Sequence, residues 1–114
     1  AARLASAEAI IAETGAVLIP PFDSREVAAG QGSCALELMA DATEQLDAIS
    51  CPVGGGGLLA GTLVAVKETR SDVRVIAAEP AAADDAARGF QIGALQPQVL
   101  PVVTIADGLT TAMS

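Results

Sequence analysis

Four consecutive glycines at residues 54–57 are the part of this 114-residue sequence best suited to chemistry. The preceding apolar segment predicts a buried strand over residues 46–53, and the following one predicts a helix over residues 58–70. Backbone amides that lack neighbouring Cβ atoms can close around an anion, and the positive end of the following helix points to the same place. A tight turn would need only one or two glycines. The run therefore predicts an anion-binding loop at a helix start.

The residues alone leave the kind of anion open. An ATP-type P-loop is excluded because no Lys-Ser or Lys-Thr pair follows the glycines. Residues 55–60 (GGGLLA) fit a dinucleotide-binding variant, and Glu79 ends the next predicted strand, where a ribose-binding acid belongs. A nicotinamide or flavin dinucleotide therefore stays open beside other phosphate-bearing cofactors.

A second candidate site is the acidic turn that begins at Glu79. Two carboxylates, on Glu79 and Asp85, flank a stretch with a free backbone carbonyl at Ala83. Oxygen ligands of this kind suit a hard cation such as Mg²⁺ or Ca²⁺. The alternative is that Asp84 or Asp85 caps a helix that ends before Gly93. From the residues alone, the cap is favoured.

The elements that must position these residues alternate between helix and strand. The strand before the glycines, the helix after them and a strand over residues 73–78 predict a βαβ unit with parallel strands. Its helix is apolar almost all round up to Val66, which predicts a buried helix. Further helices are predicted over residues 1–13, ended by Gly15, from Ser33 onward, and to about Phe90. Asp23, followed three residues later by Glu26, resembles a capping box and predicts a short helix from Asp23 to about Gly30. Strands are predicted over residues 16–19 and 102–105, and turns at residues 30–32 and 106–108.

This alternation predicts an α/β fold, a three-layer open and mainly parallel sheet with helices on both faces. The hydrophobic share of 52% opposes intrinsic disorder, and no apolar run is long enough to span a membrane. A net charge of −8 opposes binding to nucleic acid. Cys34 and Cys51 both lie in apolar surroundings and are expected to be buried, reduced thiols, which fits a cytoplasmic protein.

Four stretches occur together in this order: residues 30–33 (GQGS) with Glu37, residues 53–61 (VGGGGLLAG), Glu79-Pro80, and residues 104–109 (TIADGL). The set resembles fold-type II pyridoxal-phosphate enzymes, and within them the serine/threonine dehydratases and serine racemases. The similarity covers nearly the whole chain. Ser33 stands where the family usually has threonine, a change that should keep the expected helix cap.

The resemblance implies roles for particular residues. The cofactor phosphate would be held by Gly54, Gly55, Gly56, Gly57 and the amide of Leu58, and Gly108 would lie near the cofactor ring. The acidic turn is similar to the divalent-cation site of serine racemases, so that Mg²⁺, Mn²⁺ or Ca²⁺ would bind Glu79, the Ala83 carbonyl and Asp85. Residues 1–15 would end the smaller domain or connect to it, and residues 16–114 would form the cofactor-phosphate-binding part of the large domain.

The implied activity is that of an amino-acid lyase or isomerase. L-Serine or L-threonine would give pyruvate or 2-oxobutanoate and ammonia, or serine would be racemised, by a full-length homo-oligomer (a dimer or tetramer). The resemblance implies a Schiff-base lysine upstream of these residues. Lys67, the only lysine, lies roughly 15 Å beyond the glycines along the helix and cannot take that role. No catalytic residue is therefore expected within these 114 residues, and the piece alone should be inactive.

Two other functions and the choice of substrate stay open. The chain could belong to a nicotinamide-dependent oxidoreductase, or it could be a non-catalytic α/β binding module. Serine, threonine and 3-hydroxyaspartate are all compatible substrates. Phe22, which follows Pro20 and Pro21, lies in a region that the family places by the cofactor, although a core position is the simpler expectation.

Overall fold

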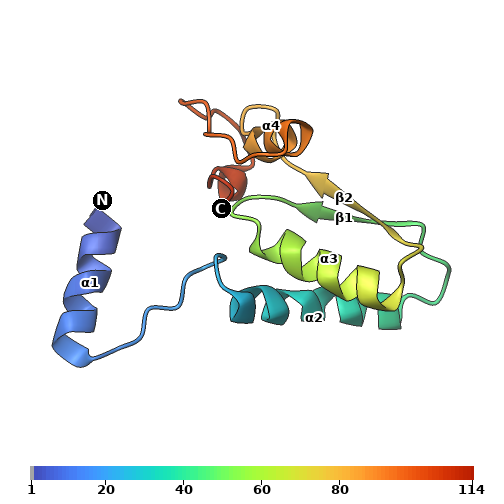
Figure 1. Cartoon of the computed structure of the whole chain (residues 1–114), viewed down its shortest axis with the longest axis horizontal. Helices are drawn as coiled ribbons and strands as arrows, with labels where there is room; N and C mark the ends of the chain where they lie inside the picture. Colours follow the sequence, from blue (N-terminus) through green and yellow to red (C-terminus); the bar gives the residue numbers. More distant parts are fainter. Residues whose placement is uncertain (1) are drawn as a thin grey trace.

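A parallel βαβ unit forms the centre of the computed structural model, which describes residues 2–114 (Figure 1). Strand β1 (Ala48–Pro52) leads through the glycines into α3 (Gly57–Thr69), and β2 (Arg74–Ala78) returns beside β1. The two strands pair in parallel from Ala48 opposite Arg74 to Pro52 opposite Ala78. The predicted βαβ unit and the α/β class are confirmed, and within the described residues the sheet has these two strands.

Helix α2 (Arg25–Asp41) is continuous and packs along α3 (Figure 1). The predicted turn at residues 30–32 and the predicted helix start at Ser33 are wrong, because both lie inside α2. The glycine at position 32 serves packing instead: a Cβ atom there would lie 2.9 Å from the carbonyl oxygen of Gly61 in α3. Ser33 does not cap a helix; its hydroxyl donates to the Gly30 carbonyl at 2.8 Å.

Ser24, and not Asp23, caps the start of α2. Its Oγ accepts the N–H of Val27 at 3.3 Å and donates to Oε2 of Glu26 at 2.6 Å. The hydroxyl of Ser24 lowers the pKa of the Glu26 carboxyl. The start of this helix was predicted within two residues, but a neighbouring side chain supplies the cap.

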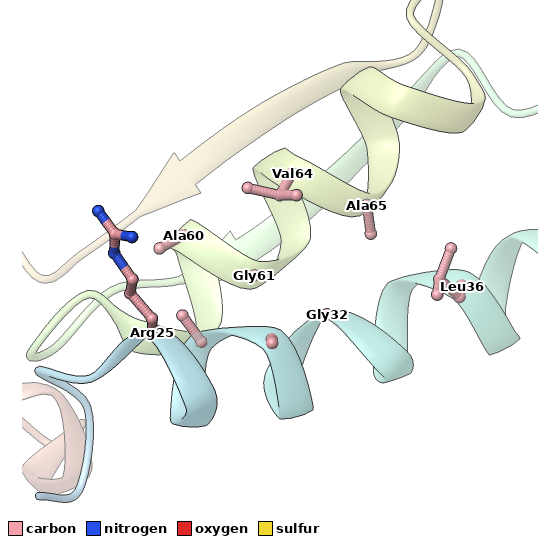
Figure 2. Close-up of a pocket in the computed structure, with 9 residues that line it drawn as sticks. Arg25, Gly32, Leu36, Ala60, Gly61, Val64 and Ala65 are labelled. Carbon is pink, nitrogen blue, oxygen red and sulfur yellow. The ribbon is translucent and has the colours of Figure 1, made fainter.

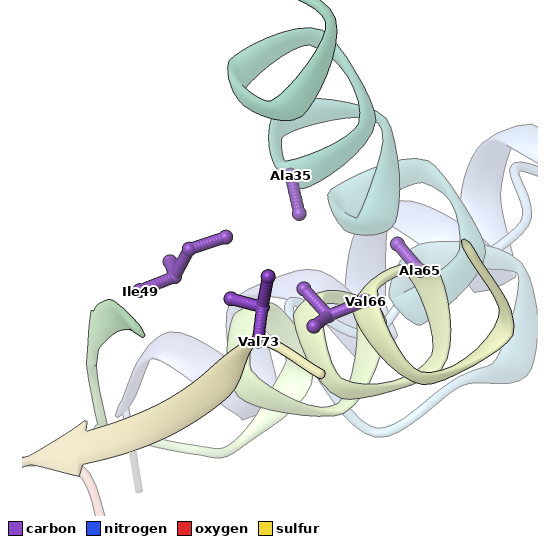
Figure 3. Packing of buried hydrophobic residues seen from close by; sticks show 5 residues of the cluster. All are labelled: Ala35, Ile49, Ala65, Val66 and Val73. Carbon is purple, nitrogen blue, oxygen red and sulfur yellow. The ribbon is translucent and has the colours of Figure 1, made fainter. Parts of the chain in front are cut away.

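A small apolar core joins α2, α3 and the sheet. Figure 3 shows its buried side chains, which are Ala35 from α2, Ile49 from β1, Ala65 and Val66 from α3, and Val73 just before β2. The prediction that α3 is buried all round is wrong, because Leu63 and Val64 are exposed. Burial in the core is therefore limited to part of the surface of this helix.

The remaining elements are α1 (Ala2–Thr14), α4 (Asp85–Ile92) and a 3₁₀ turn, η1 (Asp107–Leu109). Helices α1 and α4 lie near their predicted positions, with residue 1 outside the described residues. Gly15 and Gly93 follow them with φ values of +70° and +76°, the left-handed conformation that ends helices. Figure 1 shows α1 apart from the other elements, joined to α2 by an extended segment.

Two predicted strands, at residues 16–19 and 102–105, are absent from the structure. Both segments are mostly apolar, but no described strand pairs with them. Val17 and Val103 are accordingly exposed. The expectation of two buried cysteines is also wrong for Cys34, which is exposed on α2, whereas Cys51 is buried in β1.

Candidate functional site

The glycine loop, residues 54–57, connects the end of β1 to the start of α3. Gly56 has a φ of +98°, a conformation that strongly favours glycine, and it occupies the position just before the helix. The first intrahelical hydrogen bond of α3 runs from the N–H of Ala60 to the Gly56 carbonyl at 2.9 Å. The amides at Gly57, Leu58 and Leu59 precede that bond, so they are the free donors of the helix start.

The start of α3 differs electrostatically from those of α2 and α4. Helix α2 has the cap at Ser24 and a carboxylate at Glu26 in its first turn. Helix α4 has Asp85 in its first turn and receives the Glu79 carboxylate. Helix α3 has no side-chain cap and no acidic residue in its first turn. Its positive end is therefore left for a ligand carrying negative charge.

A pocket of about 440 Å³ opens in front of this helix start. The start of α2, the glycine loop and the last two residues of the chain contribute to its walls. The lining residues are Phe22, Asp23, Ser24, Arg25, Ala28, Gly55, Gly56, Gly57, Ala60, Met113 and Ser114. The predicted anion-binding loop thus borders a hollow, whose lining includes one basic residue, Arg25, and one acidic residue, Asp23.

The structure brings most of the predicted phosphate-binding residues together. Gly55, Gly56 and Gly57 line the pocket. Gly54 lies behind them, where an added Cβ atom would be 3.6 Å from the carbonyl oxygen of Gly108. Gly108 is therefore adjacent to the loop, although it lies far along the sequence. Leu58 turns its side chain to a second apolar cluster around Cys51, Val53 and Leu59, while its amide stays at the helix start.

The acidic turn supplies hydrogen-bond acceptors to the start of α4. The two oxygens of Glu79 accept the N–H groups of Ala86 and Ala87 at 3.2 and 2.6 Å. Asp85 is buried, and its Oδ2 accepts the N–H of Met113 at 2.8 Å. Ala83 is buried in the same turn. Glu79 and Asp85 therefore meet at one helix start, where each already has amide partners.

The predicted cation ligands are two carboxylates and a backbone carbonyl, which is fewer than the six or more oxygen ligands that Mg²⁺ or Ca²⁺ usually takes. Within residues 2–114, no group of three His, Cys, Asp or Glu side chains gathers as a metal site. A carboxylate offers about four lone-pair positions, so one amide hydrogen bond per oxygen still leaves room for a cation. The donor chemistry of Glu79, Ala83 and Asp85 thus fits a hard cation.

Several residues at the site were not singled out from the sequence. Met113 and Ser114 border the loop, and the Ser114 hydroxyl donates to the Gly55 carbonyl at 3.2 Å. Nothing in their residue types marks them. Gly61 did carry a signal, because a glycine inside a helix indicates a close packing contact. Lys67 lies where expected, in the last turn of α3, and its Nζ donates to the Val73 carbonyl at 3.1 Å.

A second hollow of about 420 Å³ runs along the contact between α2 and α3 (Figure 2). Its walls are mostly small and apolar, and they include Gly32, Leu36, Gly61 and Val64. Figure 2 shows Arg25 extending from the start of α2 beside Ala60. This groove lacks the free amides of the loop site.

None of the described helices is both long and apolar enough to cross a membrane.

The chain is similar to known proteins over nearly its whole length. All of residues 1–114 match the family described as "Pyridoxal-phosphate dependent enzyme". A serine racemase of Dictyostelium discoideum is 45% identical over 113 residues, which are 98% of this chain and 35% of the relative. A beta-hydroxyaspartate dehydratase of Paracoccus denitrificans (strain Pd 1222) is 45% identical over 98 residues, 86% of this chain and 30% of the relative.

Solved structures agree with these relatives. Maize serine racemase superposes with a TM-score of 0.89 at 38% identity, covering 98% of this chain and 33% of that one. The threonine deaminase of T.th. superposes with a TM-score of 0.88 at 46% identity, covering 93% and 39%. The expected α/β fold is thereby confirmed, and the chain spans about a third of the length of these relatives. The chain belongs to the family of pyridoxal-phosphate dependent enzymes.

Proposed function

We propose that this chain is the cofactor-phosphate-binding portion of a serine/threonine dehydratase or a serine racemase. The full-length protein would convert L-serine to pyruvate and ammonia, or L-threonine to 2-oxobutanoate and ammonia, or would racemise serine. Relatives named serine racemase, threonine deaminase and beta-hydroxyaspartate dehydratase support this class of activity. The family match favours pyridoxal phosphate over a nicotinamide dinucleotide and an enzyme over a non-catalytic module.

One observation carries the proposal: of α2, α3 and α4, only α3 starts with neither a side-chain cap nor an acidic residue. Its first amides lie beside a glycine loop and border a pocket. Hydrogen-bond donors without partners, at the positive end of a helix, form a ready-made binding site for a phosphate group. Gly54, Gly55, Gly56, Gly57 and the amide of Leu58 would therefore hold the cofactor phosphate, with Gly108 beside them.

Bound pyridoxal phosphate supplies an electron sink that stabilises negative charge on the Cα atom of an amino acid. The residues of this chain would bind and orient that group. The loop would fix its phosphate end, and the positive end of α3 would offset the phosphate charge. The Lys67 ammonium group is hydrogen-bonded to the Val73 carbonyl at the C-terminal end of α3, so the lysine that bonds to the cofactor would come from another segment. We expect the 114 residues alone to be inactive.

A divalent cation is the second part of the proposal. Glu79, the Ala83 carbonyl and Asp85 would bind Mg²⁺, Mn²⁺ or Ca²⁺. The hard oxygen donors and their place at one helix start support this assignment. The cytoplasmic location, the homo-oligomeric state and the assignment of residues 1–15 to a smaller domain or a connecting helix stay predictions.

The test is an assay of the full-length protein that carries this chain. Purified protein with pyridoxal phosphate is incubated with L-serine, L-threonine and 3-hydroxyaspartate. The 2-oxo acid and ammonia are measured, and D-serine is quantified by chiral chromatography. We expect a 2-oxo acid from at least one hydroxy amino acid, or D-serine from L-serine. A protein that binds the cofactor and yields neither product with any of the three would contradict the proposed activity.

A further inference from the structure

Phe22 lies directly against the glycine loop. A Cβ atom on Gly55 would overlap the aromatic ring of Phe22, and a Cβ atom on Gly57 would lie 3.0 Å from the Cα and Cβ atoms of the same residue. Ordinary van der Waals contacts of a Cβ atom are 3.4 Å or longer. While Phe22 keeps this position, the loop therefore has room only for glycine at 55, and a side chain at 57 would force a shift of the Phe22 backbone.

Successive contacts hold Phe22 in place. The N–H of Ser24 donates to the Phe22 carbonyl at 3.0 Å, which bends the chain just before α2. Ser24 then caps α2, and α2 packs against α3 through the close approach of Gly32 to Gly61. Because α3 begins at Gly57, the same pair of helices sets the position of the ring and of the loop.

The four glycines of the loop thus have different reasons to be glycine. Gly56 has the left-handed φ of +98°. Gly55 and Gly57 lie under Phe22, and Gly54 has only contacts of ordinary length. The number of glycines alone therefore does not measure how tightly the loop can hold an anion. The packing of Phe22 accounts for two of them.

We propose that Phe22 is a positioning residue for the cofactor-phosphate site. Its ring supports the loop at Gly55 and Gly57 and keeps the amides at the start of α3 directed to the pocket that Phe22 also lines. The inference rests on the proposed function, since it takes a phosphate as the ligand of those amides. It implies that position 55 must be glycine because of the ring and not because of the phosphate.

A double-mutant cycle in the full-length protein tests this relationship. The four forms are the wild type, Gly55→Ala, Phe22→Ala and the double variant. Melting temperature of the apoprotein reports packing, and the visible absorption of bound pyridoxal phosphate reports cofactor affinity. Gly55→Ala should lower both, because the added methyl group meets the ring. Phe22→Ala should weaken cofactor binding about tenfold, which corresponds to about 1.4 kcal/mol.

The double variant is decisive. With the ring removed, the added methyl group has space, so the double variant should regain the melting temperature and cofactor affinity of Phe22→Ala. Such recovery is a coupling between contacting residues. Phe22→Leu, which keeps an apolar side chain over the loop, should recover most of the lost affinity. Phe90→Ala is the matched control, because Phe90 is the second phenylalanine of these 114 residues and is 91% exposed on α4.

Two results would overturn the inference: additive effects of the two substitutions on melting temperature, or wild-type cofactor affinity in Phe22→Ala. Failure of the proposed function looks different. A wild-type protein that does not bind pyridoxal phosphate would refute the cofactor site. The melting-temperature cycle of the apoprotein would still decide whether Phe22 supports Gly55.

Discussion

A Cβ atom on Gly61 in α3 would lie 2.5 Å from the backbone nitrogen of Gly32 in α2 and would overlap the carbonyl oxygen of Ala28. These two helices therefore touch through their backbones. The contact fixes the start of α2 relative to the start of α3, and both helix starts border the pocket at the glycine loop. Backbone contact between α2 and α3 is thus the support on which the site is built.

Gly61→Ala should destabilise the protein by roughly 1–3 kcal/mol, the usual effect of overpacking a close contact. The free energy of unfolding, measured by denaturant titration, checks this. Gly30→Ala is the matched control in α2, because an added Cβ atom there meets nothing within 4 Å. The control should stabilise the protein by about 0.4–1 kcal/mol, since alanine restricts the unfolded chain. Equal effects of the two substitutions would contradict the role given to Gly61.

Divalent cations should raise the melting temperature if Glu79 and Asp85 bind them. At a cation concentration about 100-fold above the dissociation constant, binding adds about 2.7 kcal/mol to the stability of the folded state. Mg²⁺, Mn²⁺ and Ca²⁺ are compared with NaCl at equal ionic strength. Asp85→Asn should remove the response. Asp84→Asn should keep it, because Asp84 pairs with Arg88 instead, at 2.8 Å. A cation response that survives Asp85→Asn would place the cation elsewhere.

The two cysteines should differ in reactivity. Burial raises the pKa of the Cys51 thiol, so less of the reactive thiolate is present at a given pH, and the side chain is also inaccessible. Cys34 is exposed on α2. Alkylation of the native protein followed by peptide mass spectrometry should modify Cys34 first and reach Cys51 only on unfolding. Equal labelling of both in the native state would contradict the buried position of Cys51.

Ser24→Ala should lower stability by about 1 kcal/mol near neutral pH, a typical loss for a helix cap. The Ser24 hydroxyl lowers the pKa of Glu26 in the folded state, so the stability from that contact is present above the ordinary carboxyl pKa and is lost as pH falls through the lowered value. The difference between wild type and variant should therefore shrink in acid. Denaturant titrations of the wild type and the variant, near neutral pH and below the ordinary carboxyl pKa, measure this difference in the free energy of unfolding. Ser33→Ala, in the middle of α2, should have little effect at either pH.

The βαβ unit could be predicted because its signals are local. An apolar strand, a glycine loop and an apolar helix each have a recognisable residue pattern, and β1, α3 and β2 lie within two residues of the predicted bounds. The strand predicted at residues 16–19 failed for a different reason. A strand requires a partner as well as an apolar sequence, and Val17 is 86% exposed with no described strand beside it. Local pattern contains no information about such a partner.

Only those parts of the candidate site that have a local sequence motif could be predicted. The glycine loop and the neighbouring Gly108 follow from motifs, but the placement of Phe22 and Met113 depends on how distant segments pack. The GQGS motif shows the limit clearly. Its glycines suggested a turn at residues 30–32, whereas Gly32 lies in a continuous helix and serves contact with α3. Glycine indicates that space is needed, and only the fold shows whether for a turn or for a neighbour.

The central claim is that the start of α3 binds the phosphate of pyridoxal phosphate, and Leu58 allows a direct test of it. Leu58→Asp and Leu58→Asn remove the same apolar packing and differ by one negative charge in the first turn of the helix. Both variants should melt below the wild type, because both remove the packing of Leu58 on the apolar cluster, and the melting temperature of each apoprotein is measured to separate folding from cofactor binding. Cofactor affinity of the full-length protein is then measured from the absorption of bound pyridoxal phosphate. The account predicts that Leu58→Asp binds the cofactor at least about tenfold more weakly than Leu58→Asn, a loss of about 1.4 kcal/mol from repulsion of the phosphate. Equal affinities of the two variants would contradict it.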